Sequence, residues 1–283
     1  MSKELLASLS QSILPKKLLT AICGMSANIE CPWFKNLIIK KFIASYGVDM
    51  TEAQDSAIES YKSFNDFFIR KLKPSARVIA DSDLISPVDG YVSEIGDISS
   101  GKLLQAKGRY YSVQELLAAD GEQSSEFTAG KFATLYLSPK DYHRVHMPLS
   151  GKLLRTTYIP GALFSVKPSS VLNIPKLFAR NERLVAYFAT EVGLMALVFV
   201  GATIVGSIGT SWGGVVKRGN EIIDMDYQTK NITLDKATEA GFFKLGSTVI
   251  MLFAKGNQIN FDKNLRPSSA IKFGTSLGDF LSK

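Results

Sequence analysis

Hydrophobic positions follow two different patterns along the chain, one in about the first 70 residues and another from about Ile85 onward. In the first part, apolar residues recur three and four positions apart, which is typical of helices. The clearest stretch, PWFKNLIIKKFIASYG, opens with Pro32 and ends at Gly47, as helices commonly do. Two earlier helices are expected, one over Leu5 to Leu14 and one that begins at Pro15.

The second part predicts strands and turns, because short β-branched or alternating runs are separated by Gly, Pro, Asn and Asp. These runs are GYVSEIG, FATLYL, GKLLRTTYI, RLVAYFAT, IVGSI and STVIMLF. One short helix is expected near Ser112 to Ala119, where Ser112 and Glu115 have the spacing of a capping box. The predicted fold class is therefore α+β, with a helical N-terminal segment (1–70) on a β-rich domain (71–283).

The most apolar stretch, Val192 to Gly209, approaches the length of a membrane-spanning helix. However, four glycines interrupt it, and it is rich in valine and isoleucine. We therefore expect two buried strands joined near Gly201 rather than a span.

Charge and cysteine content restrict the partners only weakly. The net charge of +7 suits an anionic membrane or nucleic acid, but is also common in proteins without such a partner. The two cysteines, Cys23 and Cys31, form neither a zinc signature nor a disulfide framework, and a reducing compartment is expected. The helix from Pro32 combines aromatic and aliphatic residues with flanking lysines, which is typical of a helix at a bilayer interface. An ordinary amphipathic helix packed on the core is the alternative.

Candidate acid–base chemistry is confined to one stretch, DYHRVHMPLS, which holds both histidines of the chain, His143 and His146. The pair could bind a metal, but no third ligand stands nearby and the spacing is not that of zinc proteases, so no metal is expected. Two polar loop residues before Pro148 are the other structural alternative. The concentration of both histidines beside Asp141 favours a functional role.

Two further polar positions complete a possible catalytic set. Asp89 in SPVDG is either a turn aspartate or a buried carboxylate that orients a histidine. Ser247 follows Gly246 directly before an apolar strand, and its hydroxyl could attack the neighbouring Gly246 carbonyl. From LGST alone, a simple turn into a strand is the better interpretation.

Together these motifs resemble the bacterial, pyruvoyl-dependent phosphatidylserine decarboxylases. The resemblance covers nearly the whole chain from about Ser63. It is carried by SFNDFFIRKLKP, SPVDG, KGRYYS, YLSPKDYHRVHMP, GATIVGSI and, above all, FKLGSTVI. Two positions differ from many relatives, namely Ala237, where glycine is frequent, and Phe242, where a polar or basic residue is frequent; both could alter the rate of processing.

The resemblance implies that the chain cuts itself between Gly246 and Ser247 into a β chain (1–246) and an α chain (247–283). Ser247 would become a pyruvoyl group, the covalent cofactor. Asp89, His146 and Ser247 match the self-processing triad, and His143 matches the histidine of the decarboxylation step. Asp141 matches a further processing residue, and Tyr136 is a candidate for polarising a carbonyl.

The implied reaction converts phosphatidylserine to phosphatidylethanolamine through a Schiff base with the pyruvoyl group, which acts as an electron sink. Residues 1–70 would then associate with an anionic membrane surface, peripherally and on the cytoplasmic face of the cell membrane. A homodimer is expected, and no nucleic-acid partner. Two other hypotheses are a pyruvoyl decarboxylase for a soluble amino acid and a lipid-binding module in which LGST is only a turn.

Overall fold

The computed structural model describes residues 24–119, 121–203, 207–244 and 246–281. With 21% helix and 37% strand, the structure is a β-rich α+β protein, which confirms the predicted fold class. The helices predicted before residue 24 lie outside the described residues.

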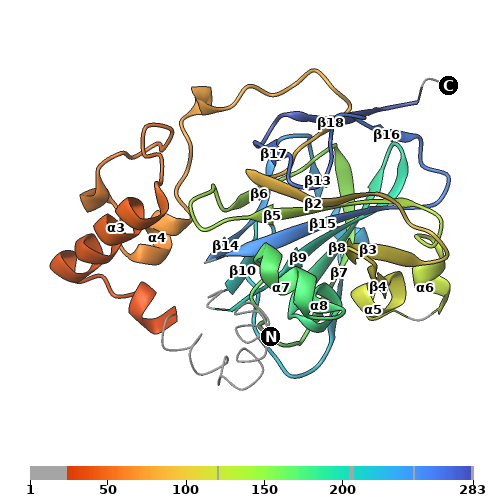
Figure 1. Ribbon diagram of the computed structural model, residues 1–283, viewed down its shortest axis with the longest axis horizontal. Helices are drawn as coiled ribbons and strands as arrows, with labels where there is room; N and C mark the ends of the chain where they lie inside the picture. The colour runs from red at the N-terminus through yellow and green to blue at the C-terminus, as the bar shows by residue number, and fades with distance from the viewer. Residues whose placement is uncertain (1–23, 120, 204–206, 245, 282–283) are drawn as a thin grey trace.

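The N-terminal helical region packs beside the β-rich body, at the left of Figure 1. α3 (Pro32–Tyr46) ends at Gly47, which adopts the left-handed conformation typical of helix C-caps. Ser63 caps α4 (Phe64–Phe68) through its side chain. The 3₁₀ turns η1 (Ile58–Ser60) and η2 (Pro74–Ala76) flank α4 along the chain. Aromatic contacts link α3 to α4: the Phe42 ring lies 5.1 to 6.1 Å from three α4 rings.

One lysine of α3 does not flank the helix as expected. Lys35 is buried, and its ammonium donates to the carbonyls of Ile58 and Glu59 in η1 and to the Asn36 side chain. The ammonium can be buried because these carbonyl and amide oxygens satisfy it. Instead, the hydrophobic side chains of Trp33 and Leu37 are exposed, at 71% and 45%.

The body is organised around a large antiparallel sheet, described as nine strands within the residues that the structure covers. β13 (Thr233–Leu234) pairs with β7 beside the main path. The main order is β12 (Ile223–Asp226), β7 (Gly151–Ile159), β8 (Arg183–Thr190), β9 (Gly193–Val200), β15 (Ser247–Phe253), β5 (Lys131–Leu137), β2 (Gly90–Asp97) and β17 (Ala270–Ile271).

Smaller sheets cover this one. A second layer has the order β11 (Gly214–Val215), β10 (Ser207–Thr210), β14 (Glu239–Lys244) and β6 (Arg144–His146). A third sheet contains β1 (Leu84–Ile85), β18 (Ser276–Phe280) and β16 (Ile259–Phe261), and a hairpin joins β3 (Lys102–Ala106) to β4 (Arg109–Ser112). The two strands predicted on either side of Gly201 are confirmed as β9 and β10, which lie in different sheets.

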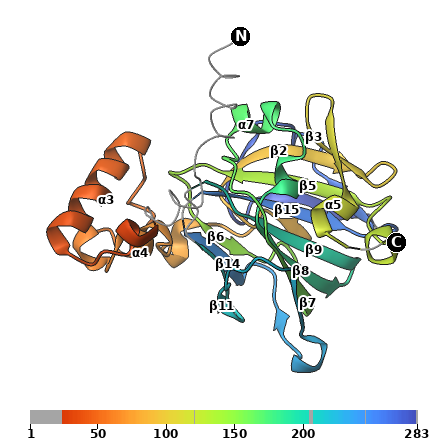
Figure 2. The same ribbon diagram turned by 90° about the horizontal axis from the view of Figure 1, so that it is seen from below.

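Short helices lie against the opposite face of the large sheet, as Figure 2 shows for α5 and α7. Ser112 and Glu115 form the predicted capping box of α5. In the described part of the chain, no helix has the length and hydropathy that a membrane span requires. The remaining helices are α5 (Val113–Leu117), α6 (Gly121–Ser125), α7 (Pro168–Asn173), α8 (Leu177–Arg180) and η3 (Gln228–Lys230).

β15 is the centre of both hydrophobic cores. Val249, Met251 and Phe253 point into the core shared with β6 and β14, whereas Ile250 and Leu252 point into the core beneath α5, α7 and α8. Every residue of this strand is buried, because both faces of the sheet are covered. The predicted nucleophile, Ser247, is therefore the first residue of a completely buried strand.

Candidate active site

The Gly246–Ser247 link lies where the chain passes from one layer of the body to the other. β14 ends at Lys244 in the four-stranded sheet, and β15 begins at Ser247 in the large sheet. Gly246 has a φ of +49°, a left-handed conformation that glycine adopts at little cost. A Cβ added at Gly246 would meet nothing within 4 Å, so the need for glycine here is conformational rather than steric.

Ser247 points toward the layer that holds the histidines. It lies opposite Leu137 of β5, and side chains alternate between the two faces along β15. Leu137 and Val249 both face the core shared with β6 and β14, so Ser247 shares that face. Ser247 is fully buried, and its Oγ has no hydrogen-bond partner within the described part of the chain.

His143 lies beside the C-terminal end of β14, close along that strand to Ser247. Its carbonyl accepts from the Phe243 backbone N–H at 3.0 Å, four residues before Ser247. His143 directly precedes β6, and its pairing with Phe243 continues the register of β6 and β14, so it shares the face of Phe243, which points into the core shared with β15. The Nδ1–H of His143 donates to the Asp141 carbonyl at 2.8 Å, so Nε2 carries the lone pair.

The imidazole of His143 is held neutral. It is completely buried, its ring centroid lies 4.1 Å from that of Phe68, and its Nε2 has no partner among the described residues. Burial lowers the pKa of His143 to about 3; the hydrogen bond to the Asp141 carbonyl opposes this shift, and the nearby Arg70 cation adds to it. The group is therefore an unprotonated base at neutral pH.

His146 lies on the opposite face of β6 and is fully hydrogen-bonded. Its Nδ1–H donates to the Ala237 carbonyl at 2.8 Å, and its Nε2 accepts from the Tyr142 hydroxyl at 3.0 Å. The Phe273 ring stacks on the imidazole, with centroids 3.7 Å apart and an interplanar angle of 15°. Burial lowers the pKa of His146 as well.

Asp89 is buried beside this group but bonds to other partners. Arg77 forms an ion pair with its carboxylate, and the Phe273 backbone N–H donates to Oδ1 at 2.8 Å. The direct orienting hydrogen bond expected from the sequence is not formed, since no described contact joins Asp89 to His146. Phe273 connects the two instead, because its backbone bonds Asp89 and its ring covers His146.

The other predicted residues surround this arrangement. The Asp141 carboxylate accepts from the Ser138 backbone N–H at 2.7 Å, and its backbone carbonyl orients His143. Burial raises the pKa of the Asp141 carboxyl. Tyr136 pairs with Thr248 and packs against the core on the other side of the sheet, away from the face of Ser247. Burial raises the pKa of Tyr136 to about 12.

Buried polar atoms without partners are concentrated around the Gly246–Ser247 link. Buried polar atoms without a hydrogen-bond partner are rare in folded proteins, so each one calls for an explanation. Four residues at or beside the link carry them: His143, Ser247, Thr248 and Ser138, which follows the strand partner of Ser247. The Ser247 hydroxyl and the His143 Nε2 are therefore available to react, because no hydrogen bond among the described residues holds either of them.

Three residues of the candidate site, Arg70, Tyr142 and Phe273, were not predicted from the sequence. Arg70 had a usable signal, because it directly follows the apolar run FFI (67–69). Tyr142 lies in the histidine motif, but no pattern indicates its bond to His146. Phe273 had no signal, since its contact with His146 joins residues that are 127 positions apart in the sequence.

Two adjoining cavities open beside the predicted residues. One, of about 200 Å³, lies between the helical region and the body and is lined by Arg70, Asp89, Asp141 and Tyr142, among others. The other, of about 300 Å³, shares Asp89 and Asp141.

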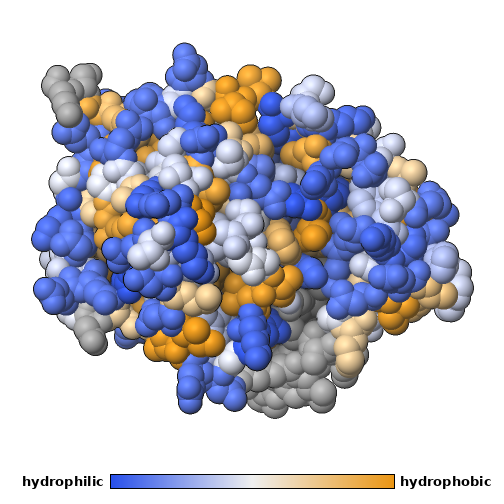
Figure 3. Space-filling model, turned by 180° about the vertical axis from the view of Figure 1, so that it is seen from behind, coloured by the Kyte–Doolittle hydropathy of each residue, from blue (hydrophilic) through white to orange (hydrophobic). Residues whose placement is uncertain are grey.

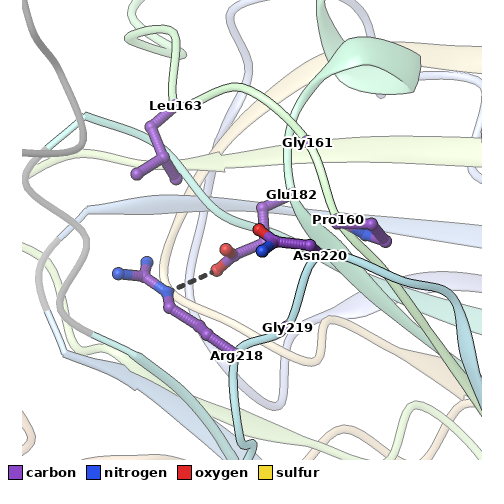
Figure 4. A pocket seen from close by; sticks show the side chains of 7 residues that line it. All are labelled: Pro160, Gly161, Leu163, Glu182, Arg218, Gly219 and Asn220. Atoms are coloured by element: carbon purple, nitrogen blue, oxygen red, sulfur yellow. Dashed lines mark hydrogen bonds and ion pairs between the residues drawn. The ribbon is translucent and has the colours of Figure 1, made fainter.

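A third cavity, of about 280 Å³, lies elsewhere (Figure 4). It is lined by Arg218, Glu182 and neighbouring residues, and the Glu182 carboxylate pairs with Arg218 at 2.8 Å. None of the predicted site residues lines this cavity, so we do not assign the chemistry to it.

Comparisons with known proteins agree with the motifs. The family model described as phosphatidylserine decarboxylase matches residues 64–279, and a second one, described as PSD, matches residues 6–47. A phosphatidylserine decarboxylase proenzyme of Legionella pneumophila is 54% identical over 276 residues, covering 97% of this chain and 98% of the relative. Proteins with the same name from Psychromonas ingrahamii and Idiomarina loihiensis are 51% and 48% identical, and each comparison covers at least 94% of both chains.

The chain is therefore an enzyme of the decarboxylase class. It belongs to the phosphatidylserine decarboxylase family.

Proposed function

We propose that this chain decarboxylates phosphatidylserine to phosphatidylethanolamine, using a pyruvoyl group made by self-cleavage between Gly246 and Ser247. The observation that carries the proposal is the buried, unpaired Ser247 hydroxyl directly after a left-handed glycine. The imidazole of His143, whose Nε2 has no partner among the described residues, belongs to a residue paired with Phe243 of the same core. The family membership and the proenzyme names of the relatives support the same reaction.

Cleavage begins with attack of the Ser247 Oγ on the Gly246 carbonyl carbon, while an imidazole takes the hydroxyl proton. The C–N bond breaks, the amine of residue 247 gains a proton, and an ester links residues 246 and 247. Removal of the Cα proton of residue 247 then expels the Gly246 carboxylate, which leaves a dehydroalanine. Water converts this group to ammonia and a ketone, so that no external oxidant or reductant is needed.

His146 and Asp89 are the proposed partners of Ser247 in processing, and His143 is assigned to decarboxylation. For His146, the support is its neutral imidazole, held by Ala237 and Phe273 next to Asp89. For His143, the support is its free Nε2 on the Ser247 side of β6. The contacts also permit a competing assignment, in which His143 is the base for cleavage, and variants of the two histidines distinguish these cases.

A pyruvoyl group fits the residues present, because the side chain at position 247 is buried and its Oγ makes no hydrogen bond among the described residues. Such a group supplies a carbonyl that forms a Schiff base with the substrate amine and takes up the electrons left by carbon dioxide. Around it, the apolar walls of β15 and β5 exclude water. His143 is placed by its Asp141 bond to deliver a proton from Nε2 once it has received one.

The substrate lipid requires contact with a membrane, which we propose is peripheral. Exposed hydrophobic side chains of the helical region include Met25, Ile29, Trp33 and Leu37. Figure 3 shows one hydrophobic area on the side of the molecule where α3 lies, next to hydrophilic surface. An aromatic and aliphatic surface on a chain of net charge +7 suits an anionic bilayer. The cytoplasmic face, the homodimer and the division at residue 70 stay predictions.

Intact-mass measurement of purified protein tests the proposal. The wild-type chain should give two fragments cut between residues 246 and 247, with the larger fragment ending at Gly246. Ser247→Ala should give one uncleaved, inactive chain, because it lacks the attacking hydroxyl. Cleavage and decarboxylation by that variant would contradict the mechanism, and activity on free serine rather than on the lipid would favour a soluble substrate.

A further inference from the structure

Arg70 is a buried cation with unused hydrogen-bond donors. The residue is only 4% exposed. Its Nη2 donates to the Lys140 carbonyl at 3.0 Å, and its guanidinium lies 5.4 Å from the centre of the Phe67 ring. Its Nε and Nη1 are buried without any partner among the described residues. Burying unpaired donors of a charged group is costly, so their retention points to a missing acceptor.

The position of Arg70 links it to the reacting groups. It lines the cavity of about 200 Å³ together with Lys140 and Lys272. Phe68, two residues before it, contacts the ring of His143, and Arg70 is close enough to His143 to act on it electrostatically. A ligand held by Arg70 would therefore lie beside the imidazole proposed for decarboxylation.

The carboxylates around this cavity are engaged elsewhere. Asp89 and Glu52 both pair with Arg77, and Glu52 also binds Lys272. The other two carboxylates cap local turns, since Asp49 accepts from Thr51 and Asp141 accepts from Ser138. Within the described residues, none of the four bonds to Arg70, which leaves its donors available to an incoming anion.

We propose that Arg70 binds the phosphodiester of the lipid substrate, an inference that rests on the proposed function. A guanidinium is suited to phosphate oxygens because it is planar and presents several donors. The substrate offers two anions, and the phosphodiester fits better than the carboxylate. The carboxylate must become neutral carbon dioxide, so a cation bound to it would stabilise the ground state more than the transition state. The phosphodiester keeps its charge throughout the reaction.

Steady-state kinetics on phosphatidylserine in mixed micelles test this assignment. Arg70→Met should raise KM by about 10- to 100-fold and leave kcat within about threefold, because uniform binding is lost. Arg70→Lys should have a smaller effect, since it keeps the charge but loses the fork of donors. Lys73→Met is the matched control: it removes an exposed cation three residues away and should leave KM unchanged. Intact mass confirms that each variant has been cleaved.

Two competitors separate the anions of the substrate. Glycerophosphoethanolamine carries the phosphodiester without the carboxylate, and free serine carries the carboxylate without the phosphodiester. The first should inhibit the wild type, and Arg70→Met should abolish that inhibition. If the variant instead loses inhibition by serine, or if its KM on the lipid is unchanged, the assignment to phosphate is wrong.

Calorimetric titration keeps this test independent of catalysis and cleavage. Ser247→Ala makes no pyruvoyl group, and it should bind glycerophosphoethanolamine at least tenfold more tightly than the double variant with Arg70→Met. Equal binding by the two variants would overturn the anion site even if the wild-type enzyme is active. Tighter binding of inorganic phosphate than of the diester would overturn the assignment to a lipid head group. Failure of the wild type to cleave would contradict only the proposed function.

Discussion

His143 and His146 stand three residues apart, and both donate Nδ1–H to a backbone carbonyl, yet they differ in the face they occupy and in the partner of Nε2. His143 faces the β15 side of its layer, has a free Nε2 and lies against Phe68. His146 faces away, has both nitrogens hydrogen-bonded and is covered by Phe273. The difference follows from the two-residue period of a strand, which sends residues three apart to opposite faces. One short motif can therefore supply two bases for two different tasks.

Alanine variants of the two histidines should give the largest contrast. His146→Ala should slow or prevent self-cleavage, because the proposed processing base is removed. His143→Ala should still be cleaved but should decarboxylate about 10²- to 10⁴-fold more slowly. Time-resolved intact mass measures the first effect, and release of carbon dioxide measures the second.

The reverse pattern would reassign the roles. If His143→Ala remains a single chain while His146→Ala is cleaved, the free Nε2 of His143 is the base for processing. Identical losses in both variants would show that the two imidazoles act in one step, which would remove the division of labour. Ser247→Ala serves as the uncleaved reference in each case.

Acid should destabilise the protein through His143. Its folded pKa of about 3 lies below the ordinary 6.5, so the unfolded chain binds the proton more readily. Stability from the neutral imidazole is complete above pH 6.5 and is lost as the pH falls toward 3. Between pH 7 and pH 5 this one group should cost about 2 kcal/mol of unfolding free energy. Denaturant titrations of Ser247→Ala at the two pH values measure the loss.

His143→Gln in the same background is the control for this effect. Glutamine does not titrate in this range, so the loss between pH 7 and pH 5 should shrink by about 2 kcal/mol. An unchanged loss would mean that His143 titrates normally and that its surroundings are not as dry as the contacts indicate. His146→Gln should reduce the loss as well, because burial also lowers the pKa of His146.

Phe273 should influence the His146 side of the comparison only. Phe273→Leu keeps the backbone N–H that binds Asp89 but removes the ring stacked on the imidazole. Cleavage should slow by about 2- to 12-fold, the equivalent of one aromatic contact. Phe261→Leu is the matched control, because Phe261 packs on Phe253 instead. Equal slowing in both variants would reduce the effect to general loss of stability.

Local patterns in the sequence predicted most of the strands on the main path of the large sheet, namely β2, β5, β7, β8, β9 and β15. β7 and β8 have the predicted bounds, and the capping box of α5 is present. These features depend on residues close together in the chain, where periodicity and turn chemistry are informative. The inward orientation of Lys35 could not be predicted, because two of its three acceptors are carbonyls of η1 more than 20 residues away.

The candidate site divides in the same way. The residues with reactive groups were found from their types and motifs, but their hydrogen-bond partners were not. Asp89 pairs with Arg77 and with a backbone N–H of the C-terminal segment, although a histidine was expected. Such pairings depend on strand order and on which layer covers which face, and neither is written into a short motif.

The smallest expected effect concerns Ala237, whose carbonyl holds His146. Ala237 has a φ of +69°, a left-handed conformation that costs a residue with a Cβ about 1–2 kcal/mol. Ala237→Gly should remove this strain but add freedom to the unfolded chain, for a net gain of about 0.5–1 kcal/mol in the free energy of unfolding.

Ala118→Gly is the matched control, because Ala118 has a φ of +46° at the end of α5, on the other side of the large sheet. Both variants should gain similar stability in denaturant titrations, and both should be cleaved at the wild-type rate because the carbonyl at 237 is kept. If Ala237→Gly alone changes the cleavage rate, the strained backbone at 237 sets the position of His146, and the protein holds one of its two imidazoles in place by a conformation that glycine would relax.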